Sequence, residues 1–320
     1  MLKHIVNTPM IKITYKIENK IQYMYAKLES YNPTGSIKDR VAYYIITKAQ
    51  ERGELKEGMP IMEATSGNTG ISLAAFGAYY KHPIYIFMPD WASSERVKLM
   101  QAFGANVTLV SREDGGFKKC LEEAKKLAEQ KQGFLANQFA NKDNTLAHYE
   151  TTGKEIVEQL PEKVSAFVSG VGTGGTLMGI GKRLKEWDKN IKIVALEPDK
   201  MPLISQNKII GNHKIEGIGD DFIPDLLEKN LLDKTILIND EDAINISRKL
   251  AKELGLGVGI SSGANFLAGV ETMQEENAPI VTVFADDNKK YLSTDLLKSI
   301  NPDKNLLSNK IDLINYETVD

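Results

Sequence analysis

Short apolar runs alternate with longer amphipathic stretches along the 320-residue chain. The short runs are mostly β-branched and are bounded by Gly, Pro or Asn, as β-strands are. The strands that this pattern predicts are 59–64, 84–88, 106–110, 164–170, 191–197 and 280–284.

The stretches between these runs carry apolar residues at helical spacing. Phe117, Cys120, Ala124 and Leu127 fall on one stripe of a helix, with Lys and Glu on the other side. Strands that alternate with helices form parallel sheets with helices on their faces, and continuously apolar strands fit burial on both sides. The pattern therefore predicts an α/β fold.

Composition fits an ordinary globular protein of about two domains, with 42% hydrophobic and 26% charged residues. No repeat of fixed period and no low-complexity linker divides the chain. The polar run at 141–144 separates two strand–helix series, so we expect a boundary near 140–150. The polar stretch 303–320 is expected to be a loosely packed tail.

Charge and cysteine content exclude several classes of function. The formal net charge is −3, without the basic excess of a nucleic-acid-binding protein. The single Cys120 allows neither an internal disulfide nor a Cys-rich zinc site, and the four histidines are scattered, so no metal site is expected. We find no apolar run of signal-peptide or membrane-span length, and we expect a cytoplasmic protein without a membrane partner.

The glycine-rich segment Gly170–Thr176 follows one predicted strand and precedes a helical run. Glycines allow close backbone approach to a ligand, and the start of a helix attracts an anion, so a phosphate is a natural guest. The segment also fits the dinucleotide pattern G-x-G-x-x-G, with Glu197 about where a ribose-binding acid is expected. A nicotinamide-dependent dehydrogenase and a tight turn without a ligand are therefore alternatives.

Two further polar segments stand before predicted helices. Thr65–Gly70 crowds hydroxyls and an amide at one helix start, which indicates either a site for a carboxylate or phosphate, or ordinary capping. In Asn32–Arg40, a Pro-Thr-Gly-Ser turn precedes Lys38. Lys38 is either a solvated surface lysine or a buried amine with a lowered pKa that can form Schiff bases.

Together these segments resemble the cysteine synthase family (O-acetylserine sulfhydrylases), which are fold-type II pyridoxal-phosphate enzymes with a tryptophan synthase β-like fold. Asn-Pro-x-x-Ser-x-Lys-Asp-Arg, Thr-Ser-Gly-Asn-Thr-Gly and Gly-Val-Gly-Thr-Gly-Gly-Thr occur in the family's order and spacing, and Gly259–Ala264 adds a fourth block. The resemblance extends from Thr8 to Thr294, nearly the whole chain.

The resemblance implies the roles of the site residues, with no metal among them. Lys38 would carry pyridoxal 5′-phosphate as an internal aldimine and, once displaced, would act as the catalytic base. Asn68 would hydrogen-bond the phenolic oxygen of the ring, and Ser261 would face its pyridine nitrogen. The cofactor phosphate would be held by Gly172, Thr173, Gly174, Gly175 and Thr176. The substrate carboxylate would be bound by Thr65, Ser66, Thr69 and Gln138.

The same resemblance implies β-replacement on a β-substituted L-alanine: O-acetyl-L-serine and sulfide would give L-cysteine and acetate through an α-aminoacrylate. Serine and threonine dehydratases differ in the substrate and phosphate blocks, whereas cystathionine β-synthases share the first block and remain an alternative. A cysteine lyase that releases hydrogen sulfide and forms serine or lanthionine is another. Family members are usually homodimers, and their carboxylate site can bind the carboxyl-terminal tail of serine acetyltransferase. The implied domains are a small inserted one at 36–145 and a large one at 1–35 and 146–302.

Two departures from the family pattern bear on the substrates. Where relatives often have Gly-Ile-Gly-Ala-Gly-Phe, Asp220 and Asp221 follow Gly219, and 285–290 replaces a Pro-Ser-Ser-Gly segment. We expect these changes to affect the leaving group and nucleophile rather than the fold or cofactor. A carboxylate at the site mouth would repel HS⁻ and could accept a proton from a thiol or water, which favours cysteine breakdown. The alternative is that both are solvated loop residues.

Overall fold

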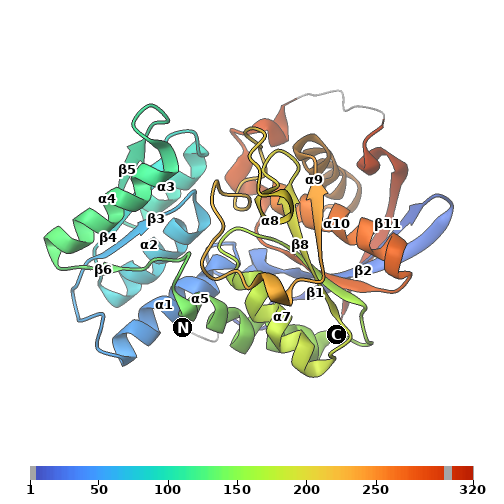
Figure 1. Ribbon diagram of the computed structural model, residues 1–320, viewed down its shortest axis with the longest axis horizontal. Helices are drawn as coiled ribbons and strands as arrows, with labels where there is room; N and C mark the ends of the chain where they lie inside the picture. The colour runs from blue at the N-terminus through green and yellow to red at the C-terminus, as the bar shows by residue number, and fades with distance from the viewer. Residues whose placement is uncertain (1–4, 299–304, 320) are drawn as a thin grey trace.

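The computed structural model describes residues 5–298 and 305–319, and it contains two β-sheets (Figure 1). The strands of both are β1 (Met10–Ile17), β2 (Lys20–Leu28), β3 (Ile61–Ala64), β4 (Ile84–Pro89), β5 (Asn106–Val110), β6 (Phe134–Leu135), β7 (Ala166–Gly170), β8 (Lys192–Pro198), β9 (Lys234–Ile238), β10 (Ile280–Phe284) and β11 (Ile311–Val319). The larger sheet has the order β11-β1-β2-β10-β7-β8-β9, and the smaller has the order β5-β4-β3-β6. The pairs β11–β1 and β1–β2 are antiparallel and the others are parallel. The predicted α/β class is confirmed, with an antiparallel edge added.

Helices cover both faces of each sheet. They are α1 (Lys38–Glu51), α2 (Asn68–Tyr80), α3 (Ser94–Ala102), α4 (Gly116–Lys131), α5 (Lys142–Ala147), α6 (Gly153–Gln159), α7 (Gly175–Trp187), α8 (Leu203–Gln206), α9 (Asp240–Leu254) and α10 (Ile260–Glu276), with a π-helical turn η3 (His148–Thr152) and 3₁₀ turns η2 (Glu29–Tyr31), η4 (Lys229–Leu231), η5 (Asn288–Tyr291), η6 (Asp295–Leu297) and η7 (Leu307–Lys310).

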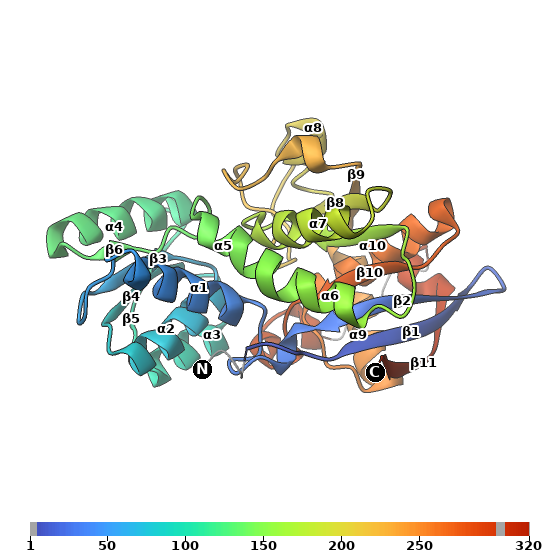
Figure 2. The ribbon, with the colours of Figure 1, turned by 90° about the horizontal axis from the view of Figure 1, so that it is seen from below.

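The apolar strands pack against helices from two sides, as their sequence predicts. On the larger sheet, α9 and α10 form one core layer, and α6 and α7 form the other; the second layer is visible in Figure 2. On the smaller sheet, α1, α2 and α3 pack on one face and α4 on the other. In the α4 layer Cys120 and Ala124 are buried, as the predicted stripe requires.

The four strands of the smaller sheet all lie within 36–145, whereas the larger sheet takes strands from both flanks. On this basis we propose a small domain at 36–145 and a large domain at 1–35 and 146–302. Residues 1–4 and 299–302 of the proposed large domain lie outside the described residues.

The expectation of a loosely packed tail at 303–320 is wrong for most of its length. Residues 311–319 form β11, which pairs with β1 along all of β1 and covers an edge that would otherwise expose backbone donors and acceptors. Residues 303, 304 and 320 lie outside the described part. The strand was missed because its side chains are mostly exposed, so no hydrophobic alternation marks it.

Within the described ranges, no helix combines the length and the apolar character that a membrane crossing needs. Across residues 5–298 and 305–319, no group of three His, Cys, Asp or Glu side chains is placed to hold a metal ion.

Candidate active site

The carboxyl ends of β3 and β7 lead into loops that meet in a pocket of about 80 Å³. We call this space the inner pocket. The predicted site residues that line it are Lys38, Thr65, Ser66, Asn68, Thr69, Gln138, Gly172, Thr173, Gly174, Thr176, Asp220 and Ser261. Gly175 and Asp221 were also predicted but do not line it. Segments more than 200 residues apart in sequence thus line one pocket, in accord with ligand binding at strand ends in α/β sheets.

Lys38 begins α1, and the residues around it are firmly held. Asp39 accepts hydrogen bonds from the Thr34 amide (2.7 Å) and the Ser72 hydroxyl (2.6 Å), which fixes the preceding turn. The Ile37 amide donates to the Ala285 carbonyl (2.8 Å). Lys38 itself faces the inner pocket, where burial lowers the pKa of its amine to about 8, while Asp220 and then Glu63 oppose the shift. About a tenth of the amine is then uncharged at pH 7, far more than for an ordinary lysine, and a nucleophile or base needs this form. Because Lys38 lines the inner pocket, the surface-lysine alternative is excluded.

The start of α2 forms the second wall. No side chain caps this helix, although Ser, Thr and Asn crowd its start, so capping does not account for them. The Thr69 hydroxyl donates to Gln138 Oε1 (2.6 Å), and Gln138 Nε2 donates to the Ala64 carbonyl (3.0 Å). Uncapped amides and the positive end of the helix dipole suit an anion such as a carboxylate.

The loop between β7 and α7 forms the third wall. Gly174 has a positive φ of 81° and, as the N-cap residue of α7, has no side chain to cap the helix; the Gly175 amide donates to Thr173 Oγ1 (3.3 Å). A Cβ on Gly172 would lie 2.3 Å from the Gly217 carbonyl oxygen, so only glycine allows the two loops to pack this closely. Gly175 serves packing instead, since a Cβ there would lie 2.1 Å from Asn144 Oδ1.

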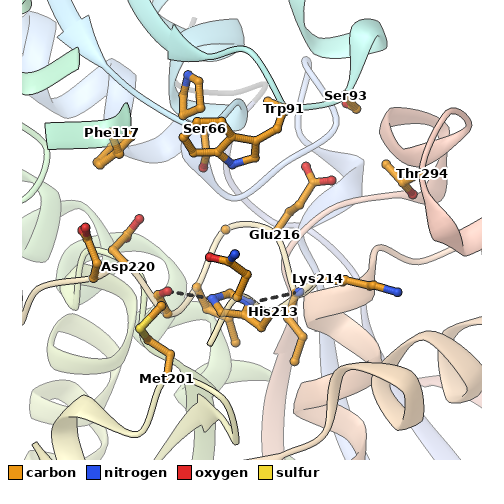
Figure 3. Close-up of a pocket in the computed structure, with 18 of the residues that line it drawn as sticks. Ser66, Trp91, Ser93, Phe117, Met201, His213, Lys214, Glu216, Asp220 and Thr294 are labelled. Atoms are coloured by element: carbon orange, nitrogen blue, oxygen red, sulfur yellow. Dashed lines mark hydrogen bonds between the residues drawn. The ribbon is translucent and has the colours of Figure 1, made fainter. Parts of the chain in front are cut away.

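The loop that carries Asp220 is tied to the glycine-rich loop. The Gly219 amide donates to the Val171 carbonyl (2.9 Å), and His213 Nε2 lies 2.7 Å from the Gly219 carbonyl oxygen (Figure 3). Asp220 is half-buried, and desolvation raises the pKa of its carboxyl to about 6; Asp221 adds to the rise and Lys38 opposes it. Asp221 is exposed. The two neighbouring aspartates therefore differ in their surroundings: Asp220 is half-buried and Asp221 is exposed.

A larger cavity of about 680 Å³ lies outside the inner pocket, and Ser66 and Asp220 line both spaces. Trp91 and Phe117 contribute to its wall opposite Asp220 and Met201 (Figure 3). The guanidinium of Arg112 stacks on Trp91 at 4.1 Å. This outer cavity is large enough for an amino acid, far larger than sulfide or water needs.

Two residues that sequence reasoning missed, Asn144 and His148, make hydrogen bonds to the loops of the inner pocket. Asn144 Nδ2 donates to Thr173 Oγ1 (2.9 Å) and to the Gln138 carbonyl (2.9 Å), so it joins two loops of the site. His148 Nε2 lies 3.2 Å from Thr176 Oγ1, and burial lowers the pKa of His148 well below its usual value. Asn144 belongs to the polar run that suggested a domain boundary, and nothing local marks either residue.

Glu197, the acidic residue that a dinucleotide site would require, is not available to a ribose. Glu197 is buried and accepts the amides of Ile204 (2.7 Å) and Ser205 (2.9 Å), so its carboxylate is used at the start of α8.

Comparison with known proteins agrees with this geometry. The family described as "Pyridoxal-phosphate dependent enzyme" matches residues 1–286. A curated cysteine synthase from Staphylococcus aureus is 40% identical over 292 residues, which cover 90% of this chain and 94% of that protein. The crystal structure of a hydrogen sulfide-producing enzyme from Fusobacterium nucleatum has a TM-score of 0.94 and 47% identity, and the match covers 99% of this chain and 98% of that one. O-acetylserine sulfhydrylase isoform 3 from Entamoeba histolytica has a TM-score of 0.85 at 40% identity, covering 94% and 91%.

Proposed function

Because the chain belongs to the family of pyridoxal-phosphate-dependent enzymes, we propose that it catalyses β-replacement on a β-substituted L-alanine, as a cysteine synthase does. O-acetyl-L-serine and sulfide are the proposed substrates, and L-cysteine and acetate are the products. The observation that carries this proposal is that Lys38, an amine with a lowered pKa, shares one pocket with two helix starts whose N-cap residues are glycines.

The residues present fit the cofactor. Thr173 and Thr176 line the inner pocket beside the start of α7, whose dipole favours a phosphate, and Asn68 brings a side-chain amide to the same pocket. We assign Lys38 to covalent attachment, Asn68 to the phenolic oxygen and Ser261 to the ring nitrogen. The phosphate-binding residues would be Gly172, Thr173, Gly174, Gly175 (through its backbone) and Thr176.

When bound, pyridoxal phosphate supplies an electron sink for the bonds at the substrate Cα. The protein's own residues orient and exchange protons. Thr65, Ser66, Thr69 and Gln138 would hold the substrate carboxylate at the start of α2, which aims the Cα proton at Lys38 Nζ. That amine takes the proton once it is free. A hydroxyl at the ring nitrogen, unlike a carboxylate, does not hold that nitrogen protonated, which favours loss of a β-substituent.

A second candidate activity is release of hydrogen sulfide from cysteine, and the position of Asp220 favours it. Above pH 6 its carboxylate repels HS⁻ within the partly dry pocket and can take a proton from an incoming thiol or water. The outer cavity also has room for an amino-acid thiol such as a second cysteine or homocysteine, which would give lanthionine or a cystathionine β-synthase-like product. The Fusobacterium nucleatum relative is named as a hydrogen sulfide producer.

Product analysis distinguishes these activities. The purified protein is supplied with O-acetylserine plus sulfide in one reaction and with cysteine alone in another, and amino acids and sulfide are quantified. Brisk cysteine formation in the first supports synthesis. Sulfide together with serine or lanthionine in the second supports breakdown. Absence of every such product, in a protein whose yellow band is bleached by borohydride, contradicts β-replacement.

We further propose that the protein is a cytoplasmic homodimer, as family members usually are, and that its carboxylate site can bind the carboxyl-terminal tail of serine acetyltransferase. The uncapped start of α2 is the feature that would bind the terminal carboxylate. Sedimentation measures the dimer. Competition between a peptide ending in such a tail and O-acetylserine tests the second role.

A further inference from the structure

The residue that follows Ala285 touches two of the four motif segments through its backbone. The backbone of Asp286 forms an antiparallel β-bridge with Ser36, which lies two residues before Lys38. Its carbonyl oxygen accepts a hydrogen bond from the Gly259 amide (3.2 Å), two residues before Ser261. Asp286 is fully buried, although sequence analysis placed it in a segment concerned with substrates only.

The side chain of Asp286 reaches a third motif segment. Its Oδ2 accepts hydrogen bonds from Asn68 Nδ2 (2.7 Å) and from the Tyr291 hydroxyl (2.8 Å). A Cβ on Gly259 would lie 2.0 Å from Asp286 Oδ1, so the carboxylate is packed directly against that backbone. Burial lowers the pKa of nearby Lys290, and Asp286 is the first of the carboxylates that oppose this shift. The carboxylate is therefore held by packing at Oδ1 and by two hydrogen bonds at Oδ2.

A carboxylate in this position decides which way the Asn68 amide points. Asp286 Oδ2 already accepts from the Asn68 nitrogen and from the Tyr291 hydroxyl, so this position favours the amide nitrogen and disfavours the amide oxygen. The nitrogen carries two hydrogens, and Asp286 takes one of them. Among the described hydrogen bonds Asn68 Nδ2 has no acceptor besides Asp286, and Asn68 lines the inner pocket, so we infer that its second hydrogen is available to a ligand there.

We propose that Asp286 is a positioning residue: it fixes the orientation of the Asn68 amide and so keeps an N–H available to the phenolic oxygen of the bound cofactor. This inference rests on the proposed role of Asn68. Without Asp286 the amide is free to turn its oxygen toward the ring oxygen, which repels it. The segment 285–290, which departs from the family pattern, would then affect cofactor binding as well as the choice of substrates.

The test uses the holoenzyme and two readouts other than turnover: the position of the visible absorption band and the rate of cofactor loss after dilution. The variants are Asp286→Ala, Asn68→Ala and the double variant. Asp287→Ala is the matched control, because Asp287 pairs with Lys289 rather than with Asn68. Loss of one such hydrogen bond should speed cofactor loss roughly tenfold.

We expect Asp286→Ala and Asn68→Ala to shift the band alike and to lose cofactor at similar rates, with the double variant no worse than either. Asp286→Asn, which keeps an acceptor oxygen, should lie between Asp286→Ala and the wild type, and it serves in its place if the alanine variant does not fold. Asp287→Ala should match the wild type.

Two outcomes overturn different claims. If Asn68→Ala leaves band and rate unchanged, the proposed role of Asn68 is wrong. If Asn68→Ala changes both but the Asp286 variants do not, or if the two effects add in the double variant, Asp286 does not act through Asn68 and the positioning role is wrong.

Discussion

Two cations stand two residues apart at the start of α1 and have opposite surroundings. Arg40 is fully buried and paired: its Nε lies 2.7 Å from Glu29 and its Nη1 2.6 Å from Glu155, and these partners raise its pKa above the usual value. Lys38 makes no ion pair with any described residue, and burial lowers its pKa to about 8. The first turn of α1 therefore carries one cation whose charge is balanced by carboxylates, Arg40, and one amine without an ion-pair partner among the described residues, Lys38.

Arg40 uses its charge to stabilise the fold, whereas Lys38 is available for chemistry. A buried pair with good geometry offsets its desolvation cost and leaves no proton to exchange at neutral pH. An unpaired, half-buried amine that faces a pocket gains reactivity from the same desolvation, and strongly perturbed groups of this kind mark functional sites. The Arg40 cluster joins η2 and α6 to α1, and so it anchors the turn from which Lys38 faces the inner pocket.

The largest expected effect comes from removing the unpaired amine. Lys38→Ala should abolish covalent cofactor attachment and slow turnover by at least about 10³-fold, because attachment point and base are lost together. Stability should be unchanged or slightly higher. Mass spectrometry after borohydride reduction should place the adduct on Lys38. Lys27 is fully buried and paired with Glu155 (2.8 Å), so it is the internal control, and an adduct there would contradict the comparison.

Removing the paired cation should affect the fold first. Arg40→Leu leaves Glu29 and Glu155 buried with one cation fewer, which should cost about 3–5 kcal/mol of unfolding free energy. Urea denaturation measures it. The double variant Arg40→Leu/Glu29→Leu should recover part of the loss. An unchanged unfolding midpoint for Arg40→Leu would show that the cluster contributes nothing to stability.

The carboxylate that faces Lys38 should control the pH dependence of cysteine breakdown. Asp220 has a pKa of about 6, so its basic form accumulates as pH rises through 6, and sulfide release should rise with it. Asp220→Asn should remove that rise and lower the release at pH 7.5 by roughly 10²-fold. Sulfide release is measured from pH 5 to 8. A variant that keeps the rise would exclude Asp220 as the proton acceptor.

The smallest effect is expected at the neighbouring aspartate. Asp221 is exposed and touches only the outer cavity, so Asp221→Asn should change sulfide release by less than about twofold. Its charge contributes to the raised pKa of Asp220, so the pH midpoint of the release should move slightly down. A larger loss than in Asp220→Asn would reverse the assignment of the two residues.

Motif order along the chain was sufficient to name residues that the structure then brings together, since most of the predicted site residues line the inner pocket. Thr65–Gly70, Gly170–Thr176 and Lys38 each combine a strand end, a polar or glycine-rich loop and a helix start, and these are local features that a single segment displays. The α/β class could be predicted because short apolar runs and helically spaced apolar residues are also local features of the sequence. The roles of the individual residues stay predictions.

Tertiary structure alone decided which groups are desolvated and which are paired. Nothing local distinguishes Asp220 from Asp221, or Asp286 from Asp287, because burial depends on loops that pack from elsewhere in the chain. Pairing of β11 with β1 likewise joins residues about 300 positions apart in the sequence. Sequence determined the chemical groups that this protein brings to its site. The fold decided their electrostatic state, since desolvation and partner distance are properties of three-dimensional surroundings.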